Sequence, residues 1–323
     1  MTTLVTGGTG FVGMNVVEAL AAAGETVIAL GHAPPPAGPA ARLAGRATFH
    51  VADIRDAAGL RAALVGRAIE RLVHTAAVTA GPARERDDPG GVVAVNVGGT
   101  VEAMRLARDL GVRRVVALSS VAVYGFADPG ASGSYAAGRS PTRPAALYGI
   151  TKLAAEQTAL RLGEIYGIDT RAVRLGPVFG PHERDTGLRD ALTPHFQAVA
   201  LARAGREIVL PRPCRADWIY SRDAAAGIAA LLAAEDAAGQ VVDLGGGAFS
   251  DLPEFCRALA TRIASLRWRI AGDGETPNVA YGLARDRAAL DNGAIARLAG
   301  FAPAFDVARA AIDHLDWLEG VRP

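Results

Sequence analysis

The stretch TLVTGGTGFVG, residues 3–13, decides the fold. A short apolar run is followed by glycines at positions 7, 10 and 13, and a helical pattern then covers residues 11–23. In such a loop the first glycine permits a tight turn, the second lets backbone N–H groups approach a pyrophosphate, and the third lets the helix pack on the strand. Because the strand before and the helix after supply the required context, we predict dinucleotide binding. The expected contacts are Gly7, Gly10, Phe11, Val12 and Gly13.

Short apolar runs continue to alternate with helical patterns along the first half of the chain. Beyond the first strand, strands are predicted at 26–30, 48–51, 71–74, 114–118 and 171–175, and helices at 56–65, 92–110 and 146–166. This alternation is typical of βαβ units. The predicted fold class is α/β, a Rossmann-type doubly wound parallel sheet.

After residue 176 the alternation is interrupted by a region rich in proline, glycine and arginine, and it resumes near residue 216. We therefore predict a dinucleotide-binding domain of residues 1–176 and 216–245, with a smaller, interleaved substrate-binding lobe of residues 177–215 and 246–323. The tail, 251–317, is expected to be mostly helical. Residues 33–41, which include four prolines, are expected to form a loop.

Composition favours small-molecule chemistry. The 323 residues carry a formal charge of only +1, which gives no electrostatic reason to expect nucleic acid or an anionic membrane as a partner. No apolar run approaches the roughly 20 residues of a membrane span, and no leader pattern precedes the first strand. Cys214 and Cys256 lack metal-like spacing, so we expect reduced thiols and no metal. A cytoplasmic enzyme fits these features.

The choice between NAD and NADP stays open. No acidic residue follows the second predicted strand, where one would bind the adenosine ribose, so a 2′-phosphate would not be repelled. His32, Arg42 or Arg55 are candidates to contact that phosphate, although His32 is equally well explained as the start of a surface loop. Asp53 and Ile54, after the third strand, are placed to hold the adenine edge.

Tyr148 and Lys152 lie four residues apart in the predicted helix 146–166, so their side chains share one helix face. A free phenol has a pKa of about 10. A nearby ammonium favours the phenolate and lowers that pKa, which would help Tyr148 to act as a base.

These motifs, with others in the same order, identify a family resemblance. The chain resembles the extended short-chain dehydrogenases/reductases, in particular the NAD-dependent epimerase/dehydratase branch. The motifs that carry it are the glycine loop, DI (53–54), HTAA (74–77), NVGGT (96–100), SSVAVYG (119–125), YGITK (148–152), RLGPVFGP (174–181) and DWIYSRD (217–223).

The resemblance implies roles for individual residues. Ser120 would hydrogen-bond the reacting oxygen, Tyr148 would exchange its proton, and Lys152 would lower the tyrosine pKa and hold the nicotinamide ribose. Further cofactor contacts are implied at Ala76, Ala77, Asn96, Ser119, Leu175, Pro177 and Val178, with Ser119 equally well explained as a strand-end turn cap. Substrate contacts are expected at Val78, Thr79, Arg184 and Arg215, together with Ser120 and Tyr148.

The polar loop 182–190 follows the predicted catalytic region. Its arginines, Arg184 and Arg189, suit recognition of a carboxylate or phosphate, because a guanidinium matches either group. A solvated loop with local salt bridges is the other explanation.

Departures from the family pattern narrow the chemistry. Val121 and Ala122 stand where dehydratases of this branch carry an Asp-Glu pair, so water elimination is disfavoured. Pro177 and Ala216 stand where sugar-nucleotide epimerases usually carry Asn and Arg, and Arg215 is only a near neighbour of the latter position. A nucleotide-sugar substrate is thereby put in doubt.

We therefore predict an NAD(P)-dependent sugar epimerase or oxidoreductase that works through a keto intermediate. Its substrate would be a sugar, sugar nucleotide or sugar acid. The alternatives are a dehydrogenase/reductase of a non-nucleotide polyol or carbonyl compound, and a non-catalytic dinucleotide-binding sensor. The resemblance also implies a homodimer formed through the helices 92–110 and 146–166.

Overall fold

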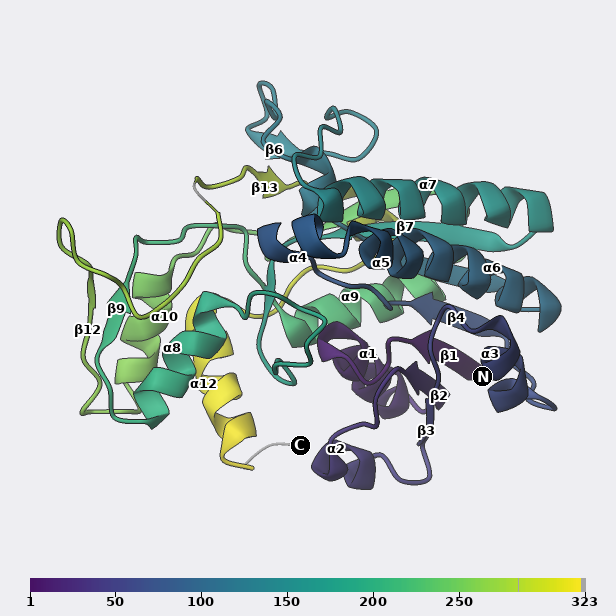
Figure 1. The fold of residues 1–323 in the computed structure, drawn as a ribbon, viewed down its shortest axis with the longest axis horizontal. Coiled ribbons are helices and arrows are strands. Elements are labelled where there is room, and N and C mark those ends of the chain that lie inside the picture. The colour runs from purple at the N-terminus through teal and green to yellow at the C-terminus, as the bar shows by residue number, and fades with distance from the viewer. Residues whose placement is uncertain (284, 321–323) are drawn as a thin grey trace.

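A seven-stranded parallel sheet forms the centre of the computed structural model, which describes residues 1–283 and 285–320 (Figure 1). Its strand order is β11-β7-β5-β4-β1-β2-β3, and every neighbouring pair is parallel. The strands are β1 (Thr2–Thr6), β2 (Thr26–Gly31), β3 (Ala47–Val51), β4 (Arg71–His74), β5 (Arg114–Ser120), β7 (Asp169–Leu175) and β11 (Val241–Leu244). The predicted doubly wound sheet is confirmed. Because the order reverses between β1 and β4, a crevice for ligands is expected at the carboxyl ends of these strands.

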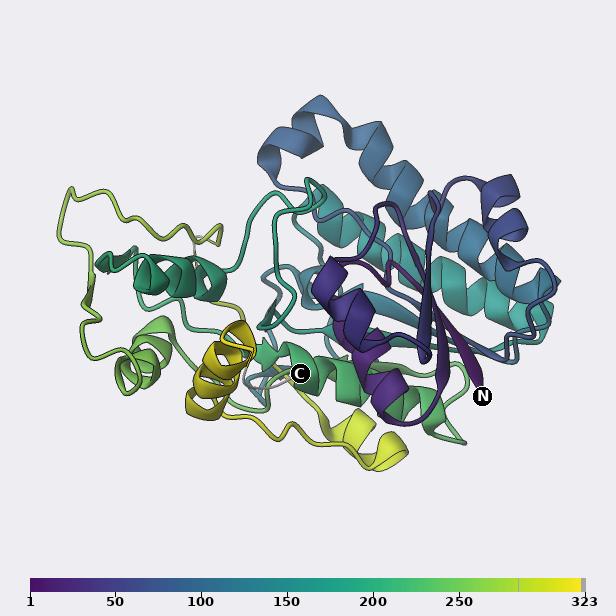
Figure 2. The same cartoon turned by 90° about the horizontal axis from the view of Figure 1, so that it is seen from below.

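Helices cover both faces of the sheet, as Figures 1 and 2 show. One face carries α1 (Phe11–Ala22), α9 (Ser221–Ala233) and α11 (Gly293–Ala299), and the other carries α3 (Ala57–Leu64), α6 (Gly99–Asp109) and α7 (Leu147–Tyr166). Side chains alternate between the two cores: Val5 joins the first and Leu4 the second, and Val116 and Val115 repeat the pattern on β5. Burial on both faces is why these strands are continuous apolar runs.

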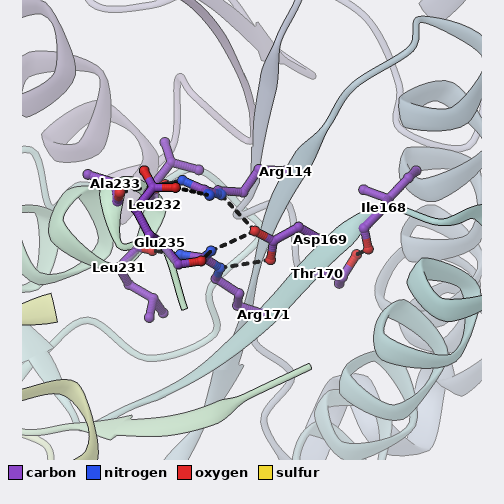
Figure 3. Close-up of polar contacts among 9 residues, drawn as sticks. All are labelled: Arg114, Ile168, Asp169, Thr170, Arg171, Leu231, Leu232, Ala233 and Glu235. Atoms are coloured by element: carbon purple, nitrogen blue, oxygen red, sulfur yellow. Dashed lines mark hydrogen bonds and ion pairs between the residues drawn. The ribbon is translucent and has the colours of Figure 1, made fainter. Parts of the chain in front are cut away.

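Two arginines fix helix α9 to the amino ends of two strands by hydrogen bonds to its carbonyl groups (Figure 3). Arg171 is fully buried and donates to both oxygens of Asp169, at 2.9 and 2.6 Å, and to the Leu231 carbonyl. Arg114 donates to the same carboxylate at 2.8 Å and to the Leu232 carbonyl at 3.0 Å. The two guanidinium groups therefore satisfy carbonyls in the last turn of α9, which have no partners within the helix.

The predicted helix 92–110 is interrupted by a wider turn. It consists of α5 (Pro89–Val93), a π-helical segment, η1 (Ala94–Gly98), and α6. Asn96 lies in the π-helical segment and is buried. Such π turns often occur at functional sites.

The prediction of a loop at 33–41 was wrong in part, because a short helix, α2 (Ala37–Arg42), lies there. Pro36 precedes the helix and Pro39 lies in its first turn, where a missing N–H removes no helical hydrogen bond. Ala40 N and Leu43 N still donate to the carbonyls of Pro36 and Pro39. Proline content therefore misled the prediction.

A second core lies beside the sheet domain, around α8 (Pro194–Arg203), α10 (Leu252–Ala260) and α12 (Val307–Leu318). It contains both cysteines, each buried with a free thiol. Strand β9 (Ile208–Leu210) pairs with β12 (Trp268–Ile270), β8 (Val178–Phe179) with β10 (Ile219–Tyr220), and β6 (Ser134–Tyr135) with β13 (Ala289–Leu290). The expectation of a mostly helical tail was wrong, because β12, β13 and long irregular connections separate its helices.

The predicted boundaries of the two lobes stay a prediction. Within the described ranges, no helix combines the length and apolar character needed to cross a membrane.

Candidate active site

Two predicted catalytic side chains meet at the carboxyl end of β5. Ser120 ends that strand and begins the short 3-10 helix η2 (Val121–Tyr124), whose Ala122 N–H donates to its Oγ at 3.2 Å. Tyr148 lies in the first turn of α7, and the side chains of Ser120 and Thr79 lie close enough to its hydroxyl group to favour the ionised form. The structure thus joins three segments that are far apart in sequence around one phenolic oxygen.

Burial raises the pKa of Tyr148 above its usual value. The hydrogen bonds from Ser120 and Thr79 and the positive charges of Arg189 and Arg287 act in the opposite direction. Tyr148 is therefore a protonated phenol at neutral pH in this state, surrounded by groups that would stabilise its anion.

Lys152 lies one turn after Tyr148 and is buried. Its Nζ donates to the carbonyl oxygen of Leu118, on β5. Burial lowers the pKa of Lys152 to about 8, while the charge of Glu156 raises it. The charges that lower the tyrosine pKa here come from arginines, so the predicted effect of Lys152 on Tyr148 stays a prediction.

A buried chain of polar groups extends behind Lys152. The carboxylate of Glu156, on the next turn of α7, receives hydrogen bonds of 2.9 and 2.7 Å from Arg174. Arg174 also donates to the hydroxyl oxygen of Tyr124 at 2.9 Å, and that hydroxyl donates to Asp243 at 2.8 Å. Burial raises the pKa of Asp243 to about 6. The chain links α7, β7, η2 and β11, which are the elements around the catalytic side chains.

Asn96 supports the site from the π-helical segment. Its amide oxygen accepts from Val78 N at 2.8 Å, and its Nδ2 donates to the Val78 carbonyl and the Thr151 hydroxyl, both at 3.0 Å. It therefore ties the segment after β4 to helix α7. Its predicted cofactor contact stays a prediction.

The glycine loop has the tight geometry that a diphosphate site needs. Gly7 has φ +70°, and a Cβ on Gly13 would lie 2.1 Å from the Gly7 carbonyl oxygen. Gly10 N donates to that oxygen at 2.9 Å. Only glycine allows this approach of helix α1 to the turn, and the residues present fit a dinucleotide.

The basic candidates near the end of β2 mostly have carboxylate partners. Arg55 donates to both oxygens of Asp53, and Arg42 lies 3.4 Å from Glu18. This pairing with Arg55 lowers the pKa of Asp53. His32 is exposed.

The remaining predicted cofactor residues line the carboxyl ends of the central strands. Buried positions are Ile54, Ser119, Leu175 and Val178, and the Ser119 Oγ has no hydrogen-bond partner within residues 1–283 and 285–320. Ala76 lies beside the glycine loop, since a Cβ on Gly7 would be 2.7 Å from its backbone nitrogen. Phe11 and Val12 begin α1, and Ala77 follows Ala76 after β4.

The arginines predicted to bind substrate lie in different places. Arg184 donates to the Thr9 carbonyl of the glycine loop at 2.6 Å. Arg215 is exposed, with its guanidinium 4.7 Å from the centre of the Phe249 ring. Arg184 and Arg215 therefore contact different parts of the described structure and share no contact there.

A small cavity lies next to Ser120, one of the predicted catalytic residues. It is lined mostly by apolar side chains, with one acid and one arginine, namely Val121, Pro177, Ala216, Asp217, Tyr281, Leu283, Arg287, Ala288 and Leu290. Sequence reasoning missed Arg287, which donates to the Gly125 carbonyl at 3.0 Å and acts on the pKa of Tyr148. Arg287 comes from the irregular tail, where no motif marks it.

The sequence is similar to those of known proteins over about half of the chain. The chain is 39% identical over 169 residues to sterol demethylase protein B of Methylococcus capsulatus, covering 52% of this chain and 49% of that protein. It is 34% identical over 160 residues to UDP-glucose 4-epimerase of Streptomyces lividans, covering 47% and 45%. The chain thus spans about half the length of the curated relatives it matches.

The structure superimposes over its whole length on a solved one. That of MoeE5 in complex with UDP-glucuronic acid and NAD has a TM-score of 0.76 at 25% identity, and all of both chains is covered. The family model for the NAD dependent epimerase/dehydratase family matches residues 3–245. Because this match includes most of the chain, the protein belongs to the NAD dependent epimerase/dehydratase family.

Proposed function

We propose that this protein is an NAD-dependent epimerase that inverts a carbinol carbon of a sugar nucleotide through a keto intermediate. The placement of Ser120, at the end of β5, beside Tyr148, in the first turn of α7, carries the proposal. A protein that only bound a dinucleotide would need the glycine loop but no acid/base pair at the carboxyl end of β5.

The first lobe, residues 1–176 and 216–245, would hold the cofactor. Gly7, Gly10 and Gly13 give a diphosphate access to backbone N–H groups, and a bound nicotinamide would supply the hydride acceptor and donor. We favour NAD over NADP because Arg55 and Arg42 already have carboxylate partners, whereas His32, the third candidate, has no ion pair with a carboxylate among the described residues.

The protein's own residues would move the proton. Ser120 would hydrogen-bond the reacting oxygen of the substrate, and Tyr148 would take its proton and return it after the carbon has been reduced from the other face. Arg189 and Arg287 favour the phenolate that exists between these two transfers. Lys152 would hold the nicotinamide ribose.

Relatives support a sugar-nucleotide substrate. The Streptomyces lividans relative is a UDP-glucose 4-epimerase, and MoeE5 was solved with UDP-glucuronic acid. In this chain Arg287 lines the cavity beside Ser120, and a guanidinium suits a phosphate. The substrate would lie between the first lobe and the second, residues 177–215 and 246–323.

The test is to incubate the purified protein with NAD and with UDP-glucose or UDP-glucuronic acid. Isomer interconversion without net accumulation of reduced nicotinamide supports an epimerase. Net accumulation indicates a dehydrogenase, and tight NAD binding without turnover on any substrate indicates a sensor.

Tyr148→Phe tests the mechanism. Because the variant keeps the ring but cannot exchange a proton, we expect turnover to fall about 10² to 10⁴-fold. NAD affinity and the melting temperature should stay at the wild-type values. A fully active variant would refute the assigned role.

A second candidate is an NAD-dependent dehydrogenase of an apolar alcohol. The cavity lining is mostly apolar, and the Methylococcus capsulatus relative is named for a sterol reaction. Pro177 and Ala216, which replace polar residues expected for a nucleotide sugar, lie in that lining. Net reduction of NAD with a hydroxysteroid, and no turnover of UDP-sugars, would favour this candidate.

We also propose a homodimer through helices α6 and α7. Exposed apolar side chains on this side of the molecule include Val93, Ile150 and Ile165, which a partner would cover. A cytoplasmic location stays a prediction.

A further inference from the structure

The loop 182–190 lies across the start of helix α1 and the glycine loop. His182 Nε2 is 2.9 Å from the Glu18 carboxylate of α1. Arg184 donates to the Thr9 carbonyl at 2.6 Å, and the Arg189 guanidinium lies 5.4 Å from the centre of the Phe11 ring. Two side chains of the loop, those of Arg184 and Arg189, therefore contact the segment that would form the diphosphate site, and His182 contacts helix α1 farther along.

The same loop is fixed to the segment after β4. Thr79 N donates to the Leu188 carbonyl at 2.9 Å, and Asp190 N donates to the Thr79 carbonyl at 3.2 Å. The Asp190 carboxylate accepts from Gly81 N and from Arg84 Nε, both at 2.8 Å. The loop thus bridges the two sides of the crevice at the carboxyl ends of β1 and β4, where a dinucleotide binds in this fold.

Arg184 has an uncompensated charge at this place. Its Nη1 is buried without a hydrogen-bond partner, and no carboxylate among residues 1–283 and 285–320 pairs with it. Burial accordingly lowers its pKa, although the guanidinium stays charged at neutral pH. The side chain as a whole is half-buried, but a buried donor atom such as this Nη1 is normally hydrogen-bonded, so a free donor beside a diphosphate loop indicates an anionic ligand.

We infer that Arg184 is a cofactor-binding residue: one nitrogen of its guanidinium is held by the Thr9 carbonyl, and the other binds the diphosphate of the dinucleotide. This inference rests on the dinucleotide part of the proposed function. It gives Arg184 a different ligand from the substrate predicted for it. Because the loop is attached on both sides of the crevice, the same contact would slow cofactor release, as an enzyme that keeps its cofactor through each cycle requires.

Binding measurements on the full chain test the inference without relying on turnover. The dissociation constants of NAD, ADP-ribose and adenosine are measured by calorimetry for the wild type, Arg184→Gln and Arg184→Lys. A charged hydrogen bond to phosphate is worth about tenfold or more in affinity. We expect Arg184→Gln to weaken NAD and ADP-ribose by at least this factor and to leave adenosine unchanged. Arg184→Lys should recover part of the loss, since an ammonium keeps the charge but not the fork.

A matched control is Arg161→Gln, which removes an exposed arginine that pairs with Glu164 on α7. It should bind all three ligands as the wild type does. Equal losses for adenosine and NAD in Arg184→Gln, or a lower melting temperature of its ligand-free form, would show that the loop was disrupted and overturn the inference. If Arg184→Gln keeps the wild-type NAD affinity but has a raised KM for the substrate, Arg184 binds the substrate, as the sequence predicted, and the inference is wrong. If the wild type binds no dinucleotide at all, the proposed function itself fails.

Discussion

At the scale of single residues, the pKa of Lys152 depends on its burial and on the charges of other buried side chains near it. In the part of the chain that the structure describes, Lys152 has no direct carboxylate partner, but Glu156 lies one turn away and is itself paired with Arg174. The lysine thus keeps a pKa of about 8 through the balance between burial and a charge that it does not touch. Small changes in this balance should alter the pH range of activity.

Glu156→Gln tests that balance. Burial lowers the pKa of Lys152 to about 8, and the charge of Glu156 opposes this shift, so its removal lowers the lysine pKa further. The role proposed for Lys152 requires the protonated lysine, so kcat/KM should decline above about pH 8 in the wild type and at lower pH in the variant. The pH profile of kcat/KM measures this shift.

The same variant leaves the Arg174 guanidinium buried without its partner. Breaking such a pair costs about 3–5 kcal/mol of unfolding free energy, which urea denaturation would report. Glu164→Gln, on the exposed side of the same helix, is the control and should change neither quantity. If kcat/KM declines at the same alkaline pH in Glu156→Gln as in the wild type, the pKa of Lys152 does not determine that decline.

At the scale of elements, the approach of helix α1 to β1 depends on glycine. A Cβ at position 13 would lie 2.1 Å from the Gly7 carbonyl oxygen, which belongs to the backbone and has little freedom to move. A Cβ on Gly98, in the π-helical segment, would meet no atom within 4 Å. Substitution of Gly13 by alanine can therefore be compared with the same substitution at Gly98, where there is room for the added Cβ.

Gly13→Ala should displace the glycine loop. We expect a loss of about 1–3 kcal/mol in unfolding free energy, together with at least a tenfold weaker affinity for NAD, about 1.4 kcal/mol. Gly98→Ala should instead gain about 0.5–1 kcal/mol, because glycine is the poorer helix former. Chemical denaturation and NAD titration check both variants. Wild-type NAD affinity in Gly13→Ala would contradict the packing argument.

The elements also show how far sequence reasoning reached. The strands of the central sheet before residue 176 were predicted to within two residues, because each is a buried apolar run with regular spacing. Helix α2 and strands β12 and β13 were missed. The proline-rich segment concealed a helix whose prolines lie before it and in its first turn, and the two strands are short ones that pair with distant segments.

At the scale of the whole molecule, the proposed dimer makes the last prediction. Ile150 is 50% exposed on α7, at the proposed interface, whereas Ile270 is 42% exposed on β12, in the second lobe. A carboxylate in an apolar interface is costly to bury. Ile150→Asp should therefore give monomers and Ile270→Asp should leave dimers, as measured by light scattering after size exclusion. A monomeric wild type would remove the dimer proposal.

The sequence by itself determined the sheet, the glycine loop and the identity of the candidate acid/base pair. These follow from local patterns: apolar periodicity, glycine spacing and side chains four residues apart on a helix. Only the tertiary structure decided what surrounds the pair. Thr79, Arg189 and Arg287 come from three distant segments to the phenol of Tyr148, and Arg184 turns to the glycine loop. These placements depend on how segments distant in the sequence come together at the edge of the sheet, and no local pattern in the chain encodes that arrangement.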